Sequence, residues 1–456
     1  MKQLLDDHIK KVHLIGIGGI SMSALAKILH KNNYQVSGSD FQDGHELREL
    51  KKLGLEIYPS HEASQVHGRD LIIYSSAIKD DNPELSEAKR LGIETMTRGH
   101  FLGLLTAQFH DSIAVSGTHG KTTTTSMISV MLKHTSIDPV LLVGAHVPEL
   151  GSNAVIGDGD VIVNEACEYF SSFLDFDYSI GVILNIDEDH LDYFKDLDHI
   201  KDTFVDFANN ARKGGTMVVN IDDPNIVSVL DRIDTKIVTY STRSEADYQA
   251  VNISYDKNGL PEFDIVHQGK TIMHVHLAIP GVYNVSNTVA AIAAICQVTD
   301  DLSGMAEALS NFHGASRRME SKGLFQGAKL IEDYAHHPNE IVSTLGAVRA
   351  MHPERKIVVA FQPHTYTRTL KLFDRFVSAF KDCDHVYLTD IYAAREKNIF
   401  GISSKDLAEE IDHQTGNAEY VGDMKNLVPI LKDTLDENCI FIAMGAGDIY
   451  KIFEML

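Results

Sequence analysis

The residues best suited to chemistry lie in one short segment, Gly117-Thr-His-Gly-Lys-Thr122. It follows an apolar run at residues 113–115 and precedes a helical pattern. Glycines in a strand-to-helix turn let backbone N–H groups approach phosphate oxygens, and the helix dipole favours negative charge there. The lysine would reach the terminal phosphates, and the threonine hydroxyl would bind Mg²⁺. We predict a short P-loop with Lys121 as a catalytic residue. The predicted nucleotide contacts are Gly117, Thr118, His119, Gly120, Lys121, Thr122 and Thr123.

Carboxylates end two later apolar runs. Glu165 closes the first, and Asn185-Ile-Asp-Glu-Asp-His190 follows the second. A carboxylate at a strand end beside a P-loop stands where Mg²⁺ needs a ligand. Acidic loops are often merely solvated, and His190 alone would favour that interpretation. Beside the P-loop we instead expect a metal site made of Thr122, Glu165 and His190.

A second glycine turn, Gly16-Ile-Gly-Gly-Ile-Ser21, lies near the N-terminus between an apolar run and a helical pattern. It resembles a dinucleotide fingerprint, although Ser21 stands where a glycine or alanine is usual. An NAD site for hydride transfer would leave the P-loop, about a hundred residues further on, unexplained. We therefore favour a nucleotide-linked substrate at this turn. Its predicted contacts are Gly18, Gly19, Ile20, Ser21, Asp40 and Ser76.

Basic and histidine-containing clusters bracket apolar runs in the last third of the chain. They are Arg317-Arg318, Glu332-Asp-Tyr-Ala-His-His-Pro338 and Phe361-Gln-Pro-His-Thr-Tyr-Thr-Arg368. The planar fork of arginine binds carboxylate or phosphate through two hydrogen bonds. Any one cluster could be a surface turn. Three clusters at strand ends of one domain indicate a binding site.

These segments need α/β units to position them. Apolar runs alternate with helical patterns in the first hundred residues, again after residue 112, and again after residue 314. Between residues 247 and 279 the pattern changes to β-rich alternation, and residues 288–296 then form an alanine-rich helical pattern. We predict three α/β domains. They are a Rossmann-like domain at 1–108, a P-loop ATPase domain at 109–313 and a second Rossmann-like domain at 314–456.

Composition narrows the possible partners. The 456 residues carry a formal net charge of −23, which disfavours nucleic acid and anionic membranes as partners. No apolar run approaches the ~20 residues of a membrane span, so we expect no membrane insertion. The four cysteines are scattered without a Cys-x-x-Cys pair, which is typical of reduced thiols. We expect a cytoplasmic protein, either a monomer or a weak homodimer.

Taken together, the motifs resemble those of the Mur ligase family. Besides the P-loop and the N-terminal glycine turn, the segments that carry the resemblance are Glu-Ala-Cys-Glu168, Asn-Ile-Asp-Glu-Asp-His190, Tyr283-Asn-Val-Ser-Asn287, Ser-Arg-Arg318, Asp-Tyr-Ala-His-His-Pro338 and Phe-Gln-Pro-His364. The resemblance runs from end to end and is greatest to the member that adds the first amino acid. It implies a UDP-substrate domain, an ATPase domain and an amino-acid-binding domain. ATP, Mg²⁺ and a role in peptidoglycan precursor synthesis follow from it.

The resemblance also implies roles for individual residues. The further ATP contacts would be Asn284, Asn287, Arg318 and Asp333. The amino-acid contacts would be His337, His364 and Arg368, with His337 and Arg368 also counted as catalytic. The chain departs from the family pattern twice. Tyr283 stands where histidine is frequent, and Thr365 stands where close relatives often have arginine.

We therefore predict an ATP-dependent amide ligase. The lactyl carboxylate of UDP-N-acetylmuramate would attack the γ-phosphoryl group, and the amine of L-alanine would displace phosphate from the acyl phosphate. ADP and phosphate would be released. Two alternatives stay open: a related ligase with another acceptor, such as a murein tripeptide, and an NAD-dependent oxidoreductase using the turn at Gly16.

Overall fold

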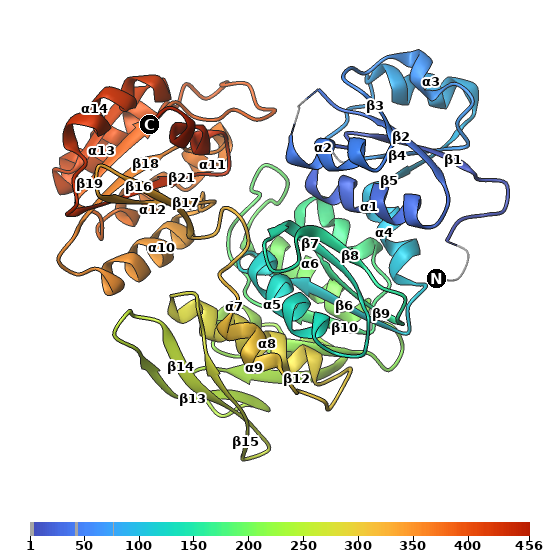
Figure 1. Cartoon of the computed structure of the whole chain (residues 1–456), viewed down its shortest axis with the longest axis horizontal. Coiled ribbons are helices and arrows are strands. Elements are labelled where there is room, and N and C mark those ends of the chain that lie inside the picture. Colours follow the sequence, from blue (N-terminus) through green and yellow to red (C-terminus); the bar gives the residue numbers. More distant parts are fainter. Residues whose placement is uncertain (1–3, 42–43, 76) are drawn as a thin grey trace.

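The computed structural model describes residues 4–41, 44–75 and 77–456. Three β-sheets lie at the centres of three lobes, and helices cover the faces of each sheet (Figure 1). The middle lobe contacts both of the others through side-chain hydrogen bonds. This three-domain α/β architecture confirms the fold class predicted from the sequence.

The N-terminal lobe contains a five-stranded parallel sheet in the order β3-β2-β1-β4-β5. The strand order reverses beside β1, which is the position where such sheets bind ligands. The glycine turn at residues 16–19 follows β1 and leads into α1, so it lies at that position. The strands are β1 (Lys11–Ile15), β2 (Gln35–Ser39), β3 (Glu56–Tyr58), β4 (Leu71–Tyr74) and β5 (Glu94–Thr97); the helices are α1 (Ile20–Lys31), α2 (His45–Lys52), η1 (Ala63–Val66), α3 (Pro83–Leu91) and α4 (Arg98–Thr106).

The middle lobe contains a ten-stranded sheet in the order β15-β14-β13-β12-β11-β10-β6-β9-β7-β8. Its central strands are parallel, and antiparallel pairs form both edges. The strands are β6 (Asp111–Ser116), β7 (Val140–Val147), β8 (Ser152–Ile156), β9 (Val161–Glu165), β10 (Ile180–Ile183), β11 (Thr216–Asn220), β12 (Lys236–Ser241), β13 (Tyr248–Tyr255), β14 (Pro261–His267) and β15 (Lys270–His276). The helices are α5 (Lys121–Lys133), η2 (Tyr169–Asp175), α6 (Leu197–Asn209), α7 (Pro224–Val227), η3 (Leu230–Arg232), α8 (Val282–Ile295) and α9 (Met305–Ser310).

The C-terminal lobe contains a six-stranded sheet in the order β16-β17-β21-β18-β19-β20, with only the β16–β17 pair antiparallel. The strands are β16 (Glu320–Phe325), β17 (Ala328–Asp333), β18 (Lys356–Phe361), β19 (His385–Thr389), β20 (Ala418–Gly422) and β21 (Cys439–Met444). The helices are α10 (Pro338–Met351), α11 (Tyr366–Lys371), α12 (Phe373–Ala379), α13 (Ser404–Thr415), η4 (Met424–Asn426), α14 (Leu427–Thr434) and η5 (Ile449–Glu454). The N-terminus of α10 points toward the middle lobe (Figure 1).

Two features of the sequence hid part of this fold. Strand β5 reads Glu-Thr-Met-Thr and buries only Met96, so no apolar run marks it. Helix α8 begins at Val282, six residues before the predicted start, because its first turns are rich in polar residues that usually favour caps and turns. The predicted domain boundaries fall between α4 and β6 and between α9 and β16. In the described part of the chain, no helix is both long and apolar enough to cross a membrane.

Candidate active site

The P-loop follows β6 and leads directly into α5, as predicted. Gly117 and Gly120 have φ values of 137° and 86°, which residues other than glycine rarely adopt. A Cβ atom at Gly120 would lie 2.8 Å from Oδ1 of Asn287. Asn185 follows β10, the strand that pairs with β6, and it holds the loop through two hydrogen bonds. Its side chain accepts the His119 N–H at 2.8 Å and donates to the His119 carbonyl at 3.0 Å.

Lys121 begins helix α5, and its ammonium group lies 2.9 Å from Glu168. Burial alone would lower the pKa of Lys121, but the charge of Glu168, its hydrogen bond to the lysine and the other acidic groups nearby together raise the pKa. The lysine is therefore a fixed cation at the helix N-terminus, where phosphate oxygens are expected. Glu168 was not among the predicted site residues. Its signal in the sequence is its place at the end of the segment Glu-Ala-Cys-Glu168, three residues after Glu165.

Two of the three predicted metal ligands lie together. The Thr122 hydroxyl donates to Glu165 at 3.1 Å, and the other carboxylate oxygen accepts the Gly144 N–H at 2.6 Å. Burial raises the pKa of Glu165. A half-buried carboxylate beside a hydroxyl supplies the oxygen ligands that Mg²⁺ prefers, so this pair fits the ion.

His190, the third predicted metal ligand, lies beside Glu168. Its Nε2 is 3.7 Å from Oε1 of Glu168, and its ring stacks on Tyr169 with centroids 4.4 Å apart. The backbone of His190 has φ 50°, which is uncommon for a residue other than glycine. A metal role for His190 stays a prediction.

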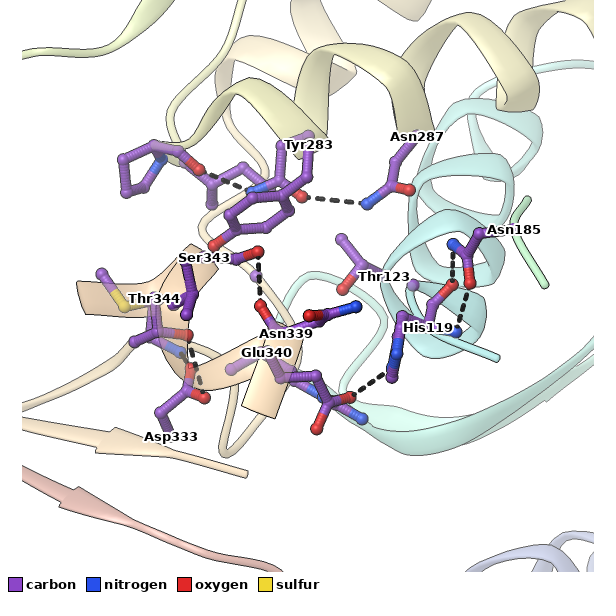
Figure 2. Close-up of a pocket in the computed structure, with 18 of the residues that line it drawn as sticks. His119, Thr123, Asn185, Tyr283, Asn287, Asp333, Asn339, Glu340, Ser343 and Thr344 are labelled. Atoms are coloured by element: carbon purple, nitrogen blue, oxygen red, sulfur yellow. Dashed lines mark hydrogen bonds and ion pairs between the residues drawn. The ribbon is translucent and has the colours of Figure 1, made fainter. Parts of the chain in front are cut away.

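A cavity of about 530 Å³ lies beside the P-loop, between the middle and C-terminal lobes (Figure 2). Seven of the eleven predicted ATP contacts line it: His119, Gly120, Thr123, Asn284, Asn287, Arg318 and Asp333. Tyr283, Asn339, Glu340, Ser343 and Thr344 also line it and were not predicted as contacts. Most of these extra residues come from the start of α10, so a helix of the third lobe completes a cavity that begins at the P-loop.

The asparagines and the aspartate in the cavity wall already have partners. Asn287 donates to Oδ1 of Asn284 at 3.2 Å, and Asn284 donates to the Pro280 carbonyl at 2.6 Å. Asp333 accepts N–H groups of Met319 and Ala335, each at 2.8 Å. Asp333 therefore shapes its own loop in this structure, and its predicted contact with ATP stays a prediction.

His119 joins the P-loop to the third lobe. Its ring nitrogens lie 3.2 Å from Asp187 and 3.3 Å from Glu340 of α10 (Figure 2 shows the contact with Glu340). Burial alone would lower the pKa of His119, but the two carboxylates raise it to about 9. Asp187 also accepts hydrogen bonds from Asn339 and Arg375 of the third lobe. A charged histidine in the phosphate loop is thus bound by acids of two lobes.

The predicted amino-acid side is tightly paired. Arg368 is 8% exposed, and its guanidinium contacts Asp189 of the middle lobe at 2.8 Å. It also donates to Nδ1 of His364 at 3.0 Å. Burial, with neighbouring positive charge, lowers the pKa of His364 to about 3. Asp189 was not predicted as the partner of Arg368.

His337 bridges the same two lobes. The buried ring caps α10, and its Nε2 donates to the Glu188 carbonyl at 3.0 Å. Burial and the nearby charge of His119 lower the pKa of His337 to about 4. Both histidines on this side are therefore neutral near pH 7 and have defined hydrogen-bond partners.

The backbone of the N-terminal glycine turn is bonded to a carboxylate, whereas the backbone of the P-loop is bonded to the amide group of Asn185. Gly18 donates its N–H to Asp40 at 3.0 Å, and a Cβ atom at Gly18 would lie 2.9 Å from that carboxylate. Gly19, Ile20 and Ser21 form the start of α1. The structure thus brings five of the six predicted contacts to one turn. Ser76, the sixth, lies outside the described residues.

Comparison with known families accounts for most of the chain. Three models match in order: the Mur ligase family catalytic domain at residues 11–110, the Mur ligase middle domain at 115–295, and the Mur ligase glutamate ligase domain at 317–447. The chain belongs to the Mur ligase family.

Individual relatives are similar to this chain over nearly its whole length. The chain is 45% identical to UDP-N-acetylmuramate--L-alanine ligase of Caldicellulosiruptor saccharolyticus over 98% of each chain. It is 43% identical to the ligase of the same name from Alkaliphilus metalliredigens, over 99% of this chain and 98% of that one. The crystal structure of UDP-N-acetylmuramate-alanine ligase from Thermotoga maritima matches with a TM-score of 0.82 and 29% identity, covering 98% of this chain and 97% of that one. The Mur ligase architecture therefore extends through all three lobes.

Proposed function

We propose that this Mur ligase joins L-alanine to the lactyl carboxylate of UDP-N-acetylmuramate, using ATP, in peptidoglycan precursor synthesis. The observation that carries the proposal is the end-to-end similarity to ligases named for that reaction. A P-loop and a second, separate glycine turn supply the two phosphate-binding turns that such a reaction needs. An NAD-dependent oxidoreductase is not favoured, because the N-terminal lobe itself matches a Mur ligase domain.

ATP is assigned to the cavity beside the P-loop. The ring of Tyr283 and the amides of Asn284 and Asn287 would face the adenosine, since an aromatic face and amide groups suit a purine. Lys121 and the N-terminus of α5 would hold the terminal phosphates. Thr122 and Glu165 would hold Mg²⁺, with His190 as the further proposed ligand. When bound, this ion supplies neutralising charge to the phosphate oxygens.

The proposed reaction has two steps. In the first, a lactyl carboxylate oxygen attacks the γ-phosphorus, the bond to the β-phosphate oxygen breaks, and ADP leaves. In the second, the alanine amine attacks the acyl carbon, and the carbon–oxygen bond to phosphate breaks. Lys121 would stabilise charge on the transferring phosphoryl group, which is usually the largest catalytic contribution in such reactions. Closure of the third lobe would exclude water from the acyl phosphate.

Arg368 is the proposed ligand of the alanine carboxylate. In this structure Asp189 occupies the guanidinium, so alanine would bind by replacing or joining that carboxylate. His337 and His364 are poorly suited to act as bases, because their lowered pKa values lie well away from neutral pH. The proton of the amine must therefore pass to a group other than these two histidines.

One assay tests the function directly. Phosphate release is measured with ATP, Mg²⁺ and UDP-N-acetylmuramate, with each of the twenty amino acids in turn. The proposal expects release that depends on the UDP-sugar and is greatest with L-alanine. Release that requires a murein tripeptide in place of the amino acid would identify the related ligase instead.

A further inference from the structure

The β7–β8 hairpin of the middle lobe is bonded to the helix that begins at the N-terminal glycine turn. Asn153 of β8 is 2% exposed, and its amide nitrogen donates to the Ile20 carbonyl at 2.5 Å and to the Ser23 hydroxyl at 3.1 Å. Its amide oxygen accepts from the Lys27 ammonium at 2.9 Å. Both the nitrogen and the oxygen of the Asn153 amide are therefore hydrogen-bonded to the first two turns of α1.

The contact extends along one face of α1. Ile20, Ser23, Lys27 and Lys31 recur every three or four residues, the spacing of one helix face. The Lys31 ammonium donates to the Ile156 carbonyl at the end of β8. The Lys31 side chain is 43% exposed, whereas Asn153 and Ser23 are buried. Buried hydrogen bonds cost more to break than exposed ones, so Asn153 is the principal polar contact of this face.

The same hairpin also contacts the predicted metal ligand. Gly144 of β7 donates its N–H to Glu165 at 2.6 Å, and a Cβ atom at Gly144 would lie 2.5 Å from that carboxylate. Strand β7 pairs with β8 on one side and with β9, which ends in Glu165, on the other. One two-stranded element thus joins α1 to the carboxylate beside the P-loop.

We propose that Asn153 is a positioning residue for the nucleotide-linked substrate, an inference that rests on the proposed function. The diphosphate would bind at the N-terminus of α1, while the γ-phosphoryl group would bind at the N-terminus of α5 on another lobe. The reacting atoms must come within about 3–3.5 Å of each other. Asn153 fixes the first of these helix ends to the lobe that carries the second, although Asn153 itself touches neither substrate.

The test uses two variants of the full-length enzyme, each of which changes a different contact of Asn153. Asn153→Asp keeps the shape and the Lys27 contact but places an acceptor against the Ile20 carbonyl. Lys27→Met removes the other contact and leaves the bond to Ile20. Asn153→Ala replaces the aspartate variant if that variant does not fold. Melting temperature, the KM of each substrate and calorimetric binding of UDP-N-acetylmuramate are measured for all.

We expect Asn153→Asp to raise the KM and Kd for UDP-N-acetylmuramate about tenfold, with the KM values for ATP and alanine within twofold of wild type. Lys27→Met should change all three KM values less than twofold. A folded Asn153→Asp variant with unchanged affinity for the UDP-sugar would overturn the inference. Equal increases in all three KM values would also overturn it, because they would indicate a general structural role. If the wild type does not bind the UDP-sugar, the proposed function itself fails.

Discussion

Two strand–glycine–helix turns in this molecule share a backbone plan and differ in what surrounds them. The N-terminal turn leads from β1 to α1, and its Gly18 N–H is bonded to Asp40. The P-loop leads from β6 to α5, and its helix begins with Lys121 and Thr122 beside the half-buried Glu165 and the buried Glu168.

The residues around each turn indicate which turn binds a substrate and which turn supports phosphoryl transfer. A helix N-terminus alone can hold a diphosphate through backbone N–H groups. Phosphoryl transfer also needs charge placed where charge develops in the transition state. Among the residues that the structure describes, only the second turn is paired with a cation, a candidate metal site and a third lobe that reaches it through His119 and Glu340. We infer that the first turn holds a substrate and the second turn activates it.

The strongest way to break this comparison is to remove the cation of the second turn. Lys121→Ala should lower turnover by about 10³-fold or more, since the loss of a positioned charge at a transferring phosphoryl group is costly. Binding of UDP-N-acetylmuramate, measured by calorimetry, should stay within threefold of wild type. Lys133→Ala, at the other end of the same helix, is the control and should retain activity. Loss of sugar binding in a folded Lys121→Ala variant would contradict the separation of the two turns.

The next effect concerns the alanine side. Arg368→Ala removes a buried guanidinium and should cost about 2–5 kcal/mol, seen mainly as a raised KM for alanine. Lys371→Ala, on the same helix and bonded to the Leu191 carbonyl, is the matched control and should change this KM little. Trapping the acyl phosphate with borohydride in the absence of alanine should still succeed in Arg368→Ala. Failed trapping with a normal alanine KM would assign Arg368 to phosphoryl transfer instead.

A smaller effect is expected from Glu165→Gln. The amide keeps the shape but removes the charge that Mg²⁺ requires. The midpoint of activity in a Mg²⁺ titration should rise about tenfold, while the affinity for ATP changes much less. An unchanged midpoint would exclude Glu165 from the metal shell.

The last expected effect is on stability and not on activity, and it depends on pH. The pKa values of His337 and His364 are lowered to about 4 and about 3 in the folded chain, from 6.5. Between about pH 6.5 and 4 the unfolded state therefore binds protons that the folded state does not, so stability falls as pH falls. Each histidine should contribute on the order of 2 kcal/mol to this loss. Chemical denaturation at several pH values checks it, and His364→Gln should flatten the slope; an unchanged slope would contradict the assignment.

The sequence predicted what is encoded within a few consecutive residues. The P-loop was found because strand, glycines, lysine and helix follow one another from residue 111 to residue 133, and local geometry settles their arrangement. Glu165 was found because it ends an apolar strand. Neighbouring parallel strands end at the same edge of the sheet, which brings Glu165 to Thr122.

The contacts between lobes could not be predicted in the same way. Arg368 meets Asp189, and His119 meets Glu340, across 179 and 221 positions of sequence. In its local sequence, each of these four residues is an ordinary charged or histidine residue in a loop or near the start of a helix. Only the packing of whole lobes decides which charges face one another. The resemblance implied that Arg368 contacts the amino acid, and it could not indicate that Asp189 pairs with this guanidinium. The role of Arg368 toward alanine stays a prediction.

The central claim, that the substrate held at the first turn is activated at the second, has one direct test. UDP-N-acetylmuramate carrying ¹⁸O in both lactyl carboxylate oxygens is converted with ATP and L-alanine, and the released phosphate is analysed by mass spectrometry. Attack of the carboxylate on the γ-phosphorus predicts one ¹⁸O atom in each phosphate and one in the new amide. Unlabelled phosphate, or label in AMP, would contradict the account.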